Sequence, residues 1–135
     1  MIQYMKGSDH MSLSKNIKKL AQSEREIMNA IWENDTPVCV NDLFTLLGDS
    51  EWKYTTVATF LTRLEKKGFL KREKRGERNY YSAAISYEEY LSSQTDEFIA
   101  DMYGGAATEF IAGFCKNRIS QKDYEELMNI LKKYE

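Results

Sequence analysis

One segment of this chain, residues 54–67, constrains the fold more than any other because its two faces differ sharply in chemistry. Side chains advance by about 100° per residue around an α-helix. One narrow face is therefore apolar and consists of Val57, Phe60, Leu61 and Leu64. The other face and its flank carry hydroxyl and basic groups and no carboxylate: Thr55, Thr56, Thr59, Thr62, Arg63 and Lys66. This pattern predicts an amphipathic helix, terminated by Gly68, that packs one side on a core and exposes the other.

Two shorter helices are predicted before this segment. The first begins at Ser23, because Ser23-Glu24-Arg25-Glu26 has the spacing of a capping box, and it ends before Pro37. The second covers residues 40–47, ends at Gly48, and is expected to bury its leucines Leu43, Leu46 and Leu47.

A β-hairpin is predicted after Gly68. Two runs with aromatic and alternating positions flank a turn at Arg75-Gly76, and Tyr80 and Tyr81 point to opposite faces, so one of them belongs to the core. Three helices followed by a hairpin are the order of a winged helix. The predicted fold class is mainly α with a small β-hairpin wing: a winged helix-turn-helix followed by a C-terminal helical dimerisation module.

The C-terminal part of the chain is predicted to be helical throughout. Ser86 opens a helix with a capping box, Gly104-Gly105 breaks it, and further helices cover about residues 106–115 and the residues after Ser120. The last helix carries a stripe of Tyr124, Leu127, Met128 and Leu131. About 50 residues of appended helix hold more apolar surface than they can bury alone, which predicts a homodimer through this stripe.

Composition sets the domain organisation and the compartment. The 135 residues are 42 % hydrophobic and contain two cysteines, too few for a disulfide framework, and no apolar run is long enough for membrane insertion. We therefore predict a cytoplasmic protein. Residues 1–11 are interpreted as a vector-derived tag or disordered leader, residues 12–83 as the winged-helix domain, and residues 84–135 as the dimerisation domain.

Charge is unevenly distributed along the chain. The formal net charge is −2, yet residues 53–78 hold nine basic and three acidic residues, a net charge of +6. Such an island favours a polyanionic partner, although helix ends and hairpins also collect lysines. We expect Thr55, Thr56, Thr59 and Arg63 to read DNA bases. The phosphate backbone is expected to meet Lys53, Thr62, Lys66, Lys67, Arg72, Lys74, Arg75 and Arg78.

Other interpretations of the same residues stay open at this point. The threonine-rich face is also compatible with a solvent-facing helix, although threonine is a mediocre helix former. The basic hairpin is also compatible with an edge protected from aggregation by charge. A winged helix that binds a protein partner through residues 54–67, without specific DNA binding, is the alternative function.

Two motifs in the chain resemble the penicillinase and methicillin-resistance repressors, the BlaI/MecI family. They are the run from Ser23 to Trp32 and the run from Thr56 to Gly68, followed by the Arg-Gly turn and Tyr80-Tyr81. The resemblance spans about residues 20–134. It implies a transcriptional repressor that binds a dyad-symmetric operator as a homodimer and controls antibiotic-resistance or related stress genes.

The resemblance also implies a mode of induction. Family members in resistance systems are cut at an Asn–Phe bond by a membrane sensor-protease system, and the matching bond here is Gly113–Phe114, with glycine in place of asparagine. A related branch senses copper through paired Cys-x-Cys motifs, whereas Cys39 and Cys115 each stand alone. No metal site or cofactor is therefore expected.

An enzyme is not expected either. The sequence holds no glycine-rich phosphate loop, no nucleophile elbow and no zinc-binding histidine pair. Its single histidine, His10, lies in the suspected tag, so the commonest general base is missing.

Overall fold

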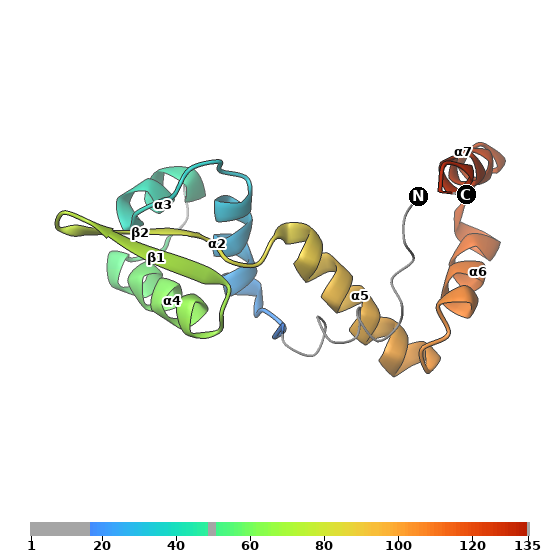
Figure 1. The fold of residues 1–135 in the computed structure, drawn as a ribbon, viewed down its shortest axis with the longest axis horizontal. Helices are drawn as coiled ribbons and strands as arrows, with labels where there is room; N and C mark the ends of the chain where they lie inside the picture. The colour runs from blue at the N-terminus through green and yellow to red at the C-terminus, as the bar shows by residue number, and fades with distance from the viewer. Residues whose placement is uncertain (1–16, 49–50, 135) are drawn as a thin grey trace. The chain divides into compact units, whose positions relative to one another are not determined.

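A computed structural model of the chain describes residues 17–48 and 51–134 (Figure 1). These residues form two compact units, one of residues 17–91 and one that contains residues 92–134. The expected leader of residues 1–11 lies outside the described residues.

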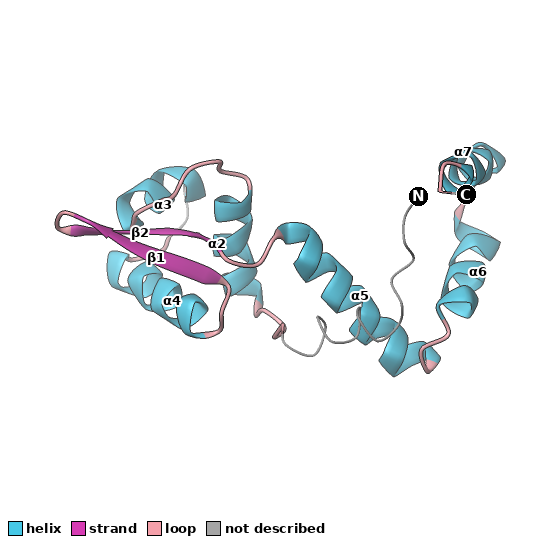
Figure 2. Ribbon diagram, in the orientation of Figure 1, coloured by secondary structure: helices cyan, strands magenta, loops and turns pink. Residues whose placement is uncertain are grey.

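The first unit is a winged helix, as the sequence predicts. It contains α2 (Gln22–Trp32), α3 (Val40–Leu47), α4 (Tyr54–Lys66) and the hairpin β1 (Leu70–Arg75) and β2 (Arg78–Ala83), followed by the first turn of α5 (Tyr87–Tyr103). Figures 1 and 2 show the three short helices gathered beside the hairpin. This unit contains α4, the helix formed by the amphipathic segment of residues 54–67.

The helix starts agree with the sequence at one end of this unit and differ at the other. Ser86 is a true capping box, in which the Glu89 amide donates to Ser86 Oγ and the Ser86 amide donates to Glu89 Oε1, both at 3.0 Å. The box predicted at Ser23 is wrong. The helix begins one residue earlier, at Gln22, and the Ala21 amide donates to Glu24 Oε1 at 2.8 Å.

The hairpin has the tightest connection that two strands can have. Arg75 pairs with Arg78, so only Gly76 and Glu77 form the turn. Gly76 has a φ of 63°, and no described non-glycine residue has a positive φ. A positive φ at the first central position alone is the pattern of a type II′ turn, which matches the twist of the strands.

A third short extended segment joins the hairpin. Val38 and Tyr81 form an antiparallel bridge, in which the Tyr81 amide donates to Val38 O at 2.7 Å and the Val38 amide donates to Tyr81 O at 2.9 Å. The bridge ties the loop before α3 to the wing. It was not predicted, because a single bridge leaves no alternating pattern in the sequence.

The core of the first unit is assembled from every element. Its fully buried side chains include Ile27, Met28, Leu43, Val57, Leu61, Leu64 and Phe69. Tyr81 is the buried member of the tyrosine pair, and burial is the largest of the effects that raise its pKa. The prediction for Leu46 is wrong, since its side chain is 45 % exposed. Leu46 lies about 60° around the helix from the fully buried Leu43, at the edge of the apolar face, whereas Leu47 packs partly buried against the core.

The second unit consists of the remainder of α5 with α6 (Ala107–Arg118) and α7 (Gln121–Lys132). Rings of Phe98, Tyr103, Phe110 and Phe114 contact one another at centroid distances from 5.3 to 6.4 Å. Yet among described residues 92–134 no apolar side chain is buried. Within the described part of the chain, no helix is long and apolar enough to span a membrane.

Candidate nucleic-acid interface

The outer face of α4 is exposed along its whole length. Thr55, Thr56, Thr59, Thr62, Arg63 and Lys66 are all exposed, while Val57, Leu61 and Leu64 have no accessible surface. Lys53, the residue before the helix, is exposed as well. The helix therefore has the two faces that the sequence predicts.

Two of the threonines on this face have a fixed hydroxyl orientation. Thr59 Oγ1 donates to Thr55 O at 2.8 Å and Thr62 Oγ1 donates to Ala58 O at 3.1 Å, each to the carbonyl one turn earlier. Because the hydroxyl proton is used inside the helix, the outward side of each threonine offers oxygen lone pairs and a methyl group.

The guanidinium of Arg63 stacks on an aromatic ring. Its guanidinium carbon lies 5.1 Å from the centroid of Phe60, and the Phe60 ring meets Trp52 edge-on at 5.3 Å. A guanidinium over an aromatic face keeps its charge and its N–H fork while losing part of its rotational freedom. The side chain is thereby oriented without being neutralised.

The wing carries two kinds of basic residue. Arg72 faces Glu65 on α4 at 3.3 Å, and Arg75 donates to Glu73 at 2.7 Å while stacking on Tyr80 at 5.0 Å. The hydrogen bond to Glu73 is the largest cause that raises the pKa of Arg75. Lys74 and Arg78 lie exposed along the same hairpin.

A groove of about 260 Å³ brings the wing and α4 together. Its lining includes Thr62 and Ala58 of α4, Arg78 and Asn79 of the wing, and Asn41 of α3. Thr62 of the threonine face and Arg78 of the basic hairpin therefore border one surface, which also includes Glu77 of the turn.

Tyr54 belongs to this surface and was not among the residues predicted from sequence. It lines the same groove, is 56 % exposed, and stacks on Phe44 with ring centroids 6.1 Å apart. Its place at the first residue of the second helix of a helix-turn-helix is a signal that could have found it.

Lys67 has a different environment from its predicted phosphate-contacting neighbours. Its Nζ lies 2.7 and 2.9 Å from the two carboxylate oxygens of Glu24, and its side chain is 26 % exposed. Sequence reasoning could not find this pair, because 43 residues separate its members.

The ionisation of Glu24 follows from the same contacts. Burial opposes the charged form and raises the pKa. The hydrogen bonds from Lys67 and the Ala21 amide, with the positive charges of Lys67 and Arg63, outweigh it and lower the pKa of Glu24 below its ordinary value. Glu24 is a buried carboxylate that stays ionised.

Comparison with known families decides what kind of chain has this arrangement. A model of the penicillinase repressor family matches residues 20–133, which include both units. The chain belongs to the penicillinase repressor family. Its winged helix and its helical second unit are thus both family features.

Two relatives, compared by sequence, agree with the family assignment. The methicillin resistance regulatory protein MecI of Staphylococcus aureus is 30 % identical over 116 residues, covering 85 % of this chain and 94 % of its own. The penicillinase repressor of Bacillus licheniformis is 29 % identical, covering 89 % and 94 %. A solution structure of the DNA-binding domain of the repressor BlaI is 32 % identical, with a TM-score of 0.49, over 55 % of this chain and 90 % of that one.

The predicted dimerisation residues of this family member lie on the surface of α7. Tyr124, Met128 and Leu131 are 48, 38 and 42 % exposed, and Leu127 is half-buried. Gly113 and Phe114 are exposed within α6. Of the cysteines, Cys39 is buried and Cys115 half-buried. Among the described residues, no three potential metal ligands of the His, Cys, Asp and Glu types cluster together.

Proposed function

We propose that the protein is a transcriptional repressor that binds a dyad-symmetric operator as a homodimer and acts by binding rather than by catalysis. The observation that carries this proposal is the continuous surface of α4 and the wing. An exposed helix face without carboxylates lies beside a hairpin that holds Arg72, Lys74, Arg75 and Arg78. Such a pairing supplies base contacts from a helix and phosphate contacts from a basic hairpin.

Family membership supports the same function. Relatives that match most of this chain are named for the repression of penicillinase and for the regulation of methicillin resistance. We extend that role to this chain and propose that it acts in the cytoplasm, on antibiotic-resistance or related stress genes.

The chemistry of α4 supports particular roles for its residues. Thr55, Thr56, Thr59 and Arg63 are proposed to read bases. Thr59, with its proton donated inward, would accept from adenine N6 or cytosine N4 or place its methyl group on thymine, and Arg63 would donate to guanine. Phosphate contacts are proposed for Lys53, which precedes α4, for Lys66 at its end, and for Arg72, Lys74, Arg75 and Arg78 of the wing. Thr62 would join them by turning its hydroxyl from Ala58 O to donate to a phosphate oxygen.

The surface of α7 supports the homodimer. Exposed apolar side chains at Tyr124, Met128 and Leu131 follow one another at helical spacing. A second copy of the same stripe is self-complementary, as a two-fold interface requires, and dimers of this kind bind operators whose symmetry mirrors their own.

Induction by proteolysis at Gly113–Phe114 is a separate part of the proposal. The bond lies in an exposed stretch of α6, and glycine within a helix weakens it by about 1 kcal/mol relative to alanine, which favours local opening. The proposed partner is a membrane sensor-protease. Immunoblots of host cells treated with a β-lactam should show a fragment ending at Gly113. An intact chain during induction would exclude this switch.

Salt-dependent binding to duplex DNA tests the main proposal. An operator-like duplex is first selected from a random-sequence pool with the purified protein, and its affinity is then measured from about 50 to 200 mM salt. A repressor that neutralises several phosphates loses affinity steeply over this range. Weak association that does not depend on salt would instead support the protein-interaction module.

The substitution Arg63→Ala sharpens that test. If Arg63 donates to a guanine, the change should cost on the order of 1–3 kcal/mol on the selected duplex and relax the preference at one base position. A matched change outside the α4 surface, Lys122→Ala in α7, should leave the affinity unchanged. Equal affinities for wild type and Arg63→Ala would remove Arg63 from the base-reading set.

A further inference from the structure

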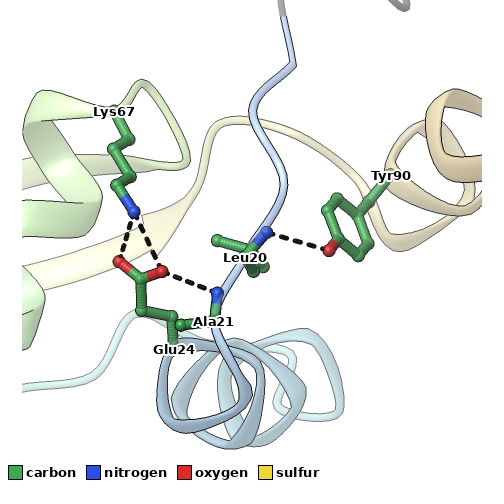
Figure 3. Close-up of polar contacts among 5 residues, drawn as sticks. All are labelled: Leu20, Ala21, Glu24, Lys67 and Tyr90. Atoms are coloured by element: carbon green, nitrogen blue, oxygen red, sulfur yellow. Dashed lines mark hydrogen bonds and ion pairs between the residues drawn. The ribbon is translucent and has the colours of Figure 1, made fainter. Parts of the chain in front are cut away.

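Glu24 is the most deeply buried charged side chain among the described residues, and its contacts join the start of α2 to the end of α4. The residue is 1 % exposed. Its carboxylate accepts two hydrogen bonds from Lys67 Nζ, at 2.7 and 2.9 Å, and one from the Ala21 amide at 2.8 Å (Figure 3). The contacts reach from the start of α2 to Lys67, the residue that caps the C-terminal end of α4.

Stability alone is a poor reason for this arrangement. A buried ion pair repays its desolvation only with good geometry, and apolar residues of similar volume often do as well. What an ion pair adds is direction, because the ammonium must meet both oxygens while the carboxylate also accepts from a fixed amide. The pair therefore holds the end of α4 at one place relative to α2.

The backbone just before Ala21 is also held in place, by a contact from another element. The Leu20 amide donates to the hydroxyl of Tyr90 at 3.1 Å in a buried contact, and Figure 3 shows Leu20 and Ala21 held from two sides. Tyr90 is itself packed against Phe69, with ring centroids 5.7 Å apart. Two adjacent backbone amides are thus anchored, one by each partner, and Glu24 has little freedom to shift.

We propose that Glu24 is a positioning residue for DNA recognition, which acts through Lys67 to fix the base-reading face of α4. The inference rests on the proposed function. Lys67 is then a link within the protein and does not contact a phosphate. A small rotation of α4 would move Thr55, Thr59 and Arg63 away from base edges, while flexible lysines on its surface could still reach the backbone.

Three variants separate this role from direct phosphate contact. Glu24→Gln keeps an acceptor for the Ala21 amide and removes the charge. Lys67→Met removes the ammonium and keeps most of the stem, and the double variant removes the ion pair altogether. Each is titrated against the duplex selected by the wild type and against an unrelated duplex, at several salt concentrations. Thermal unfolding of each variant confirms that it is folded.

The two single variants are expected to lose affinity for the selected duplex by the same factor. Glu24→Gln and Lys67→Met should each weaken binding to the selected duplex about tenfold, the size of one lost base contact. The double variant should be no weaker than either single one, because both remove the same link. Binding to the unrelated duplex and the slope of log K against log salt should stay at the wild-type values.

Lys66→Met is the matched control. Lys66 is the exposed neighbour of Lys67, so its removal should lower the salt slope by about 0.9 and weaken binding to both duplexes alike. Should Lys67→Met behave like this control while Glu24→Gln binds as the wild type does, Lys67 contacts phosphate and the proposal is overturned. Wild-type affinity in all three variants overturns it too.

The outcome for unstable variants is also decisive. If Lys67→Met fails to fold because it leaves Glu24 buried without a partner, Glu24→Gln and the double variant still carry the test. A wild-type protein that binds no duplex at all would contradict the proposed function itself, which is a different result from any of those above.

Discussion

The two units of this molecule solve the problem of apolar surface in opposite ways. Residues 17–91 bury a continuous core in which Ile27, Leu61 and Phe69 have no accessible surface. Described residues 92–134 contain aromatic rings that touch one another, yet none of their apolar side chains is buried, and Met102 is 67 % exposed. The first unit has an interior of its own. In the described part of the second unit, every apolar side chain remains at least partly exposed.

This difference indicates which unit needs a protein partner to cover its apolar surface. A few hundred Å² of contiguous apolar surface is the usual limit for a soluble monomer, and larger patches mark interfaces. The second unit has exposed apolar residues on α5, α6 and α7, whereas the first has its exposed threonines and basic residues on one side. The chain thus combines a unit suited to a charged partner with a unit suited to a copy of itself.

The largest expected effect comes from the core of the first unit. Leu61→Ala should lower the free energy of unfolding by about 2–5 kcal/mol, because it removes buried methyl groups and leaves a cavity. Urea unfolding monitored by tryptophan fluorescence measures it, since both tryptophans, Trp32 and Trp52, lie in this unit. The loss should be the same at low and high protein concentration. A loss that varies with concentration would mean that this core depends on the partner copy.

The next effect belongs to the second unit and should depend on concentration. Leu131→Ala removes a side chain that is 42 % exposed in one copy and that a dimer would cover. We expect the dimer to weaken by about 1–2 kcal/mol per protomer, measured by sedimentation equilibrium. Lys122→Ala, a polar change on the same helix, is the control and should leave association unchanged. A wild-type protein that sediments as a monomer at micromolar concentration would contradict the comparison between the two units.

Local signals explain how much of the winged helix could be predicted from sequence. The apolar stripe of α4, the glycines after α3 and α4, the Gly76 turn and the Ser86 capping box are each encoded within a few residues, and each was found in the structure. The outer face of α4 follows from the same periodicity, so the exposure of Thr55, Thr59 and Arg63 could be predicted with it.

Contacts between distant residues account for the rest. The Glu24–Lys67 pair and the bridge between Val38 and Tyr81 join segments 43 residues apart. No local pattern encodes either of them. The misplaced cap has a local cause instead: Glu24 bonds to the amide of Ala21, a residue type that offers no capping side chain and so does not mark a helix start. Which residues touch DNA and which meet in the dimer stays a prediction, since both depend on a second molecule.

The Glu24–Lys67 pair of the first unit should make the free energy of unfolding depend on pH in the acid range. The pKa of Glu24 is lowered in the folded protein, so its contribution is fully present above the unfolded value, about 4.3. That contribution is lost as pH falls through the lower folded value. Glu24→Gln has no such titration. Relative to this variant, the wild type should lose stability on acidification, because protonation of Glu24 weakens its contacts with Lys67 and the Ala21 amide. Parallel stability curves for the two proteins between pH 6 and roughly pH 2 would show that this carboxylate does not titrate as described.

The smallest effect compares single charges on the two units. Arg78 lines the groove beside Thr62 in a segment of net charge +6, whereas Lys122 lies in α7, within residues 79–135, whose net charge is −5. Arg78→Ala should lower the slope of log K against log salt by about 0.9 and the affinity at 0.1 M salt by roughly threefold, because one phosphate contact is lost. Lys122→Ala should change neither quantity. An equal loss from both variants would mean that a diffuse field attracts DNA and that the wing makes no specific contact. The assignment of DNA binding to the first unit would then be wrong, even if the second unit still formed the dimer.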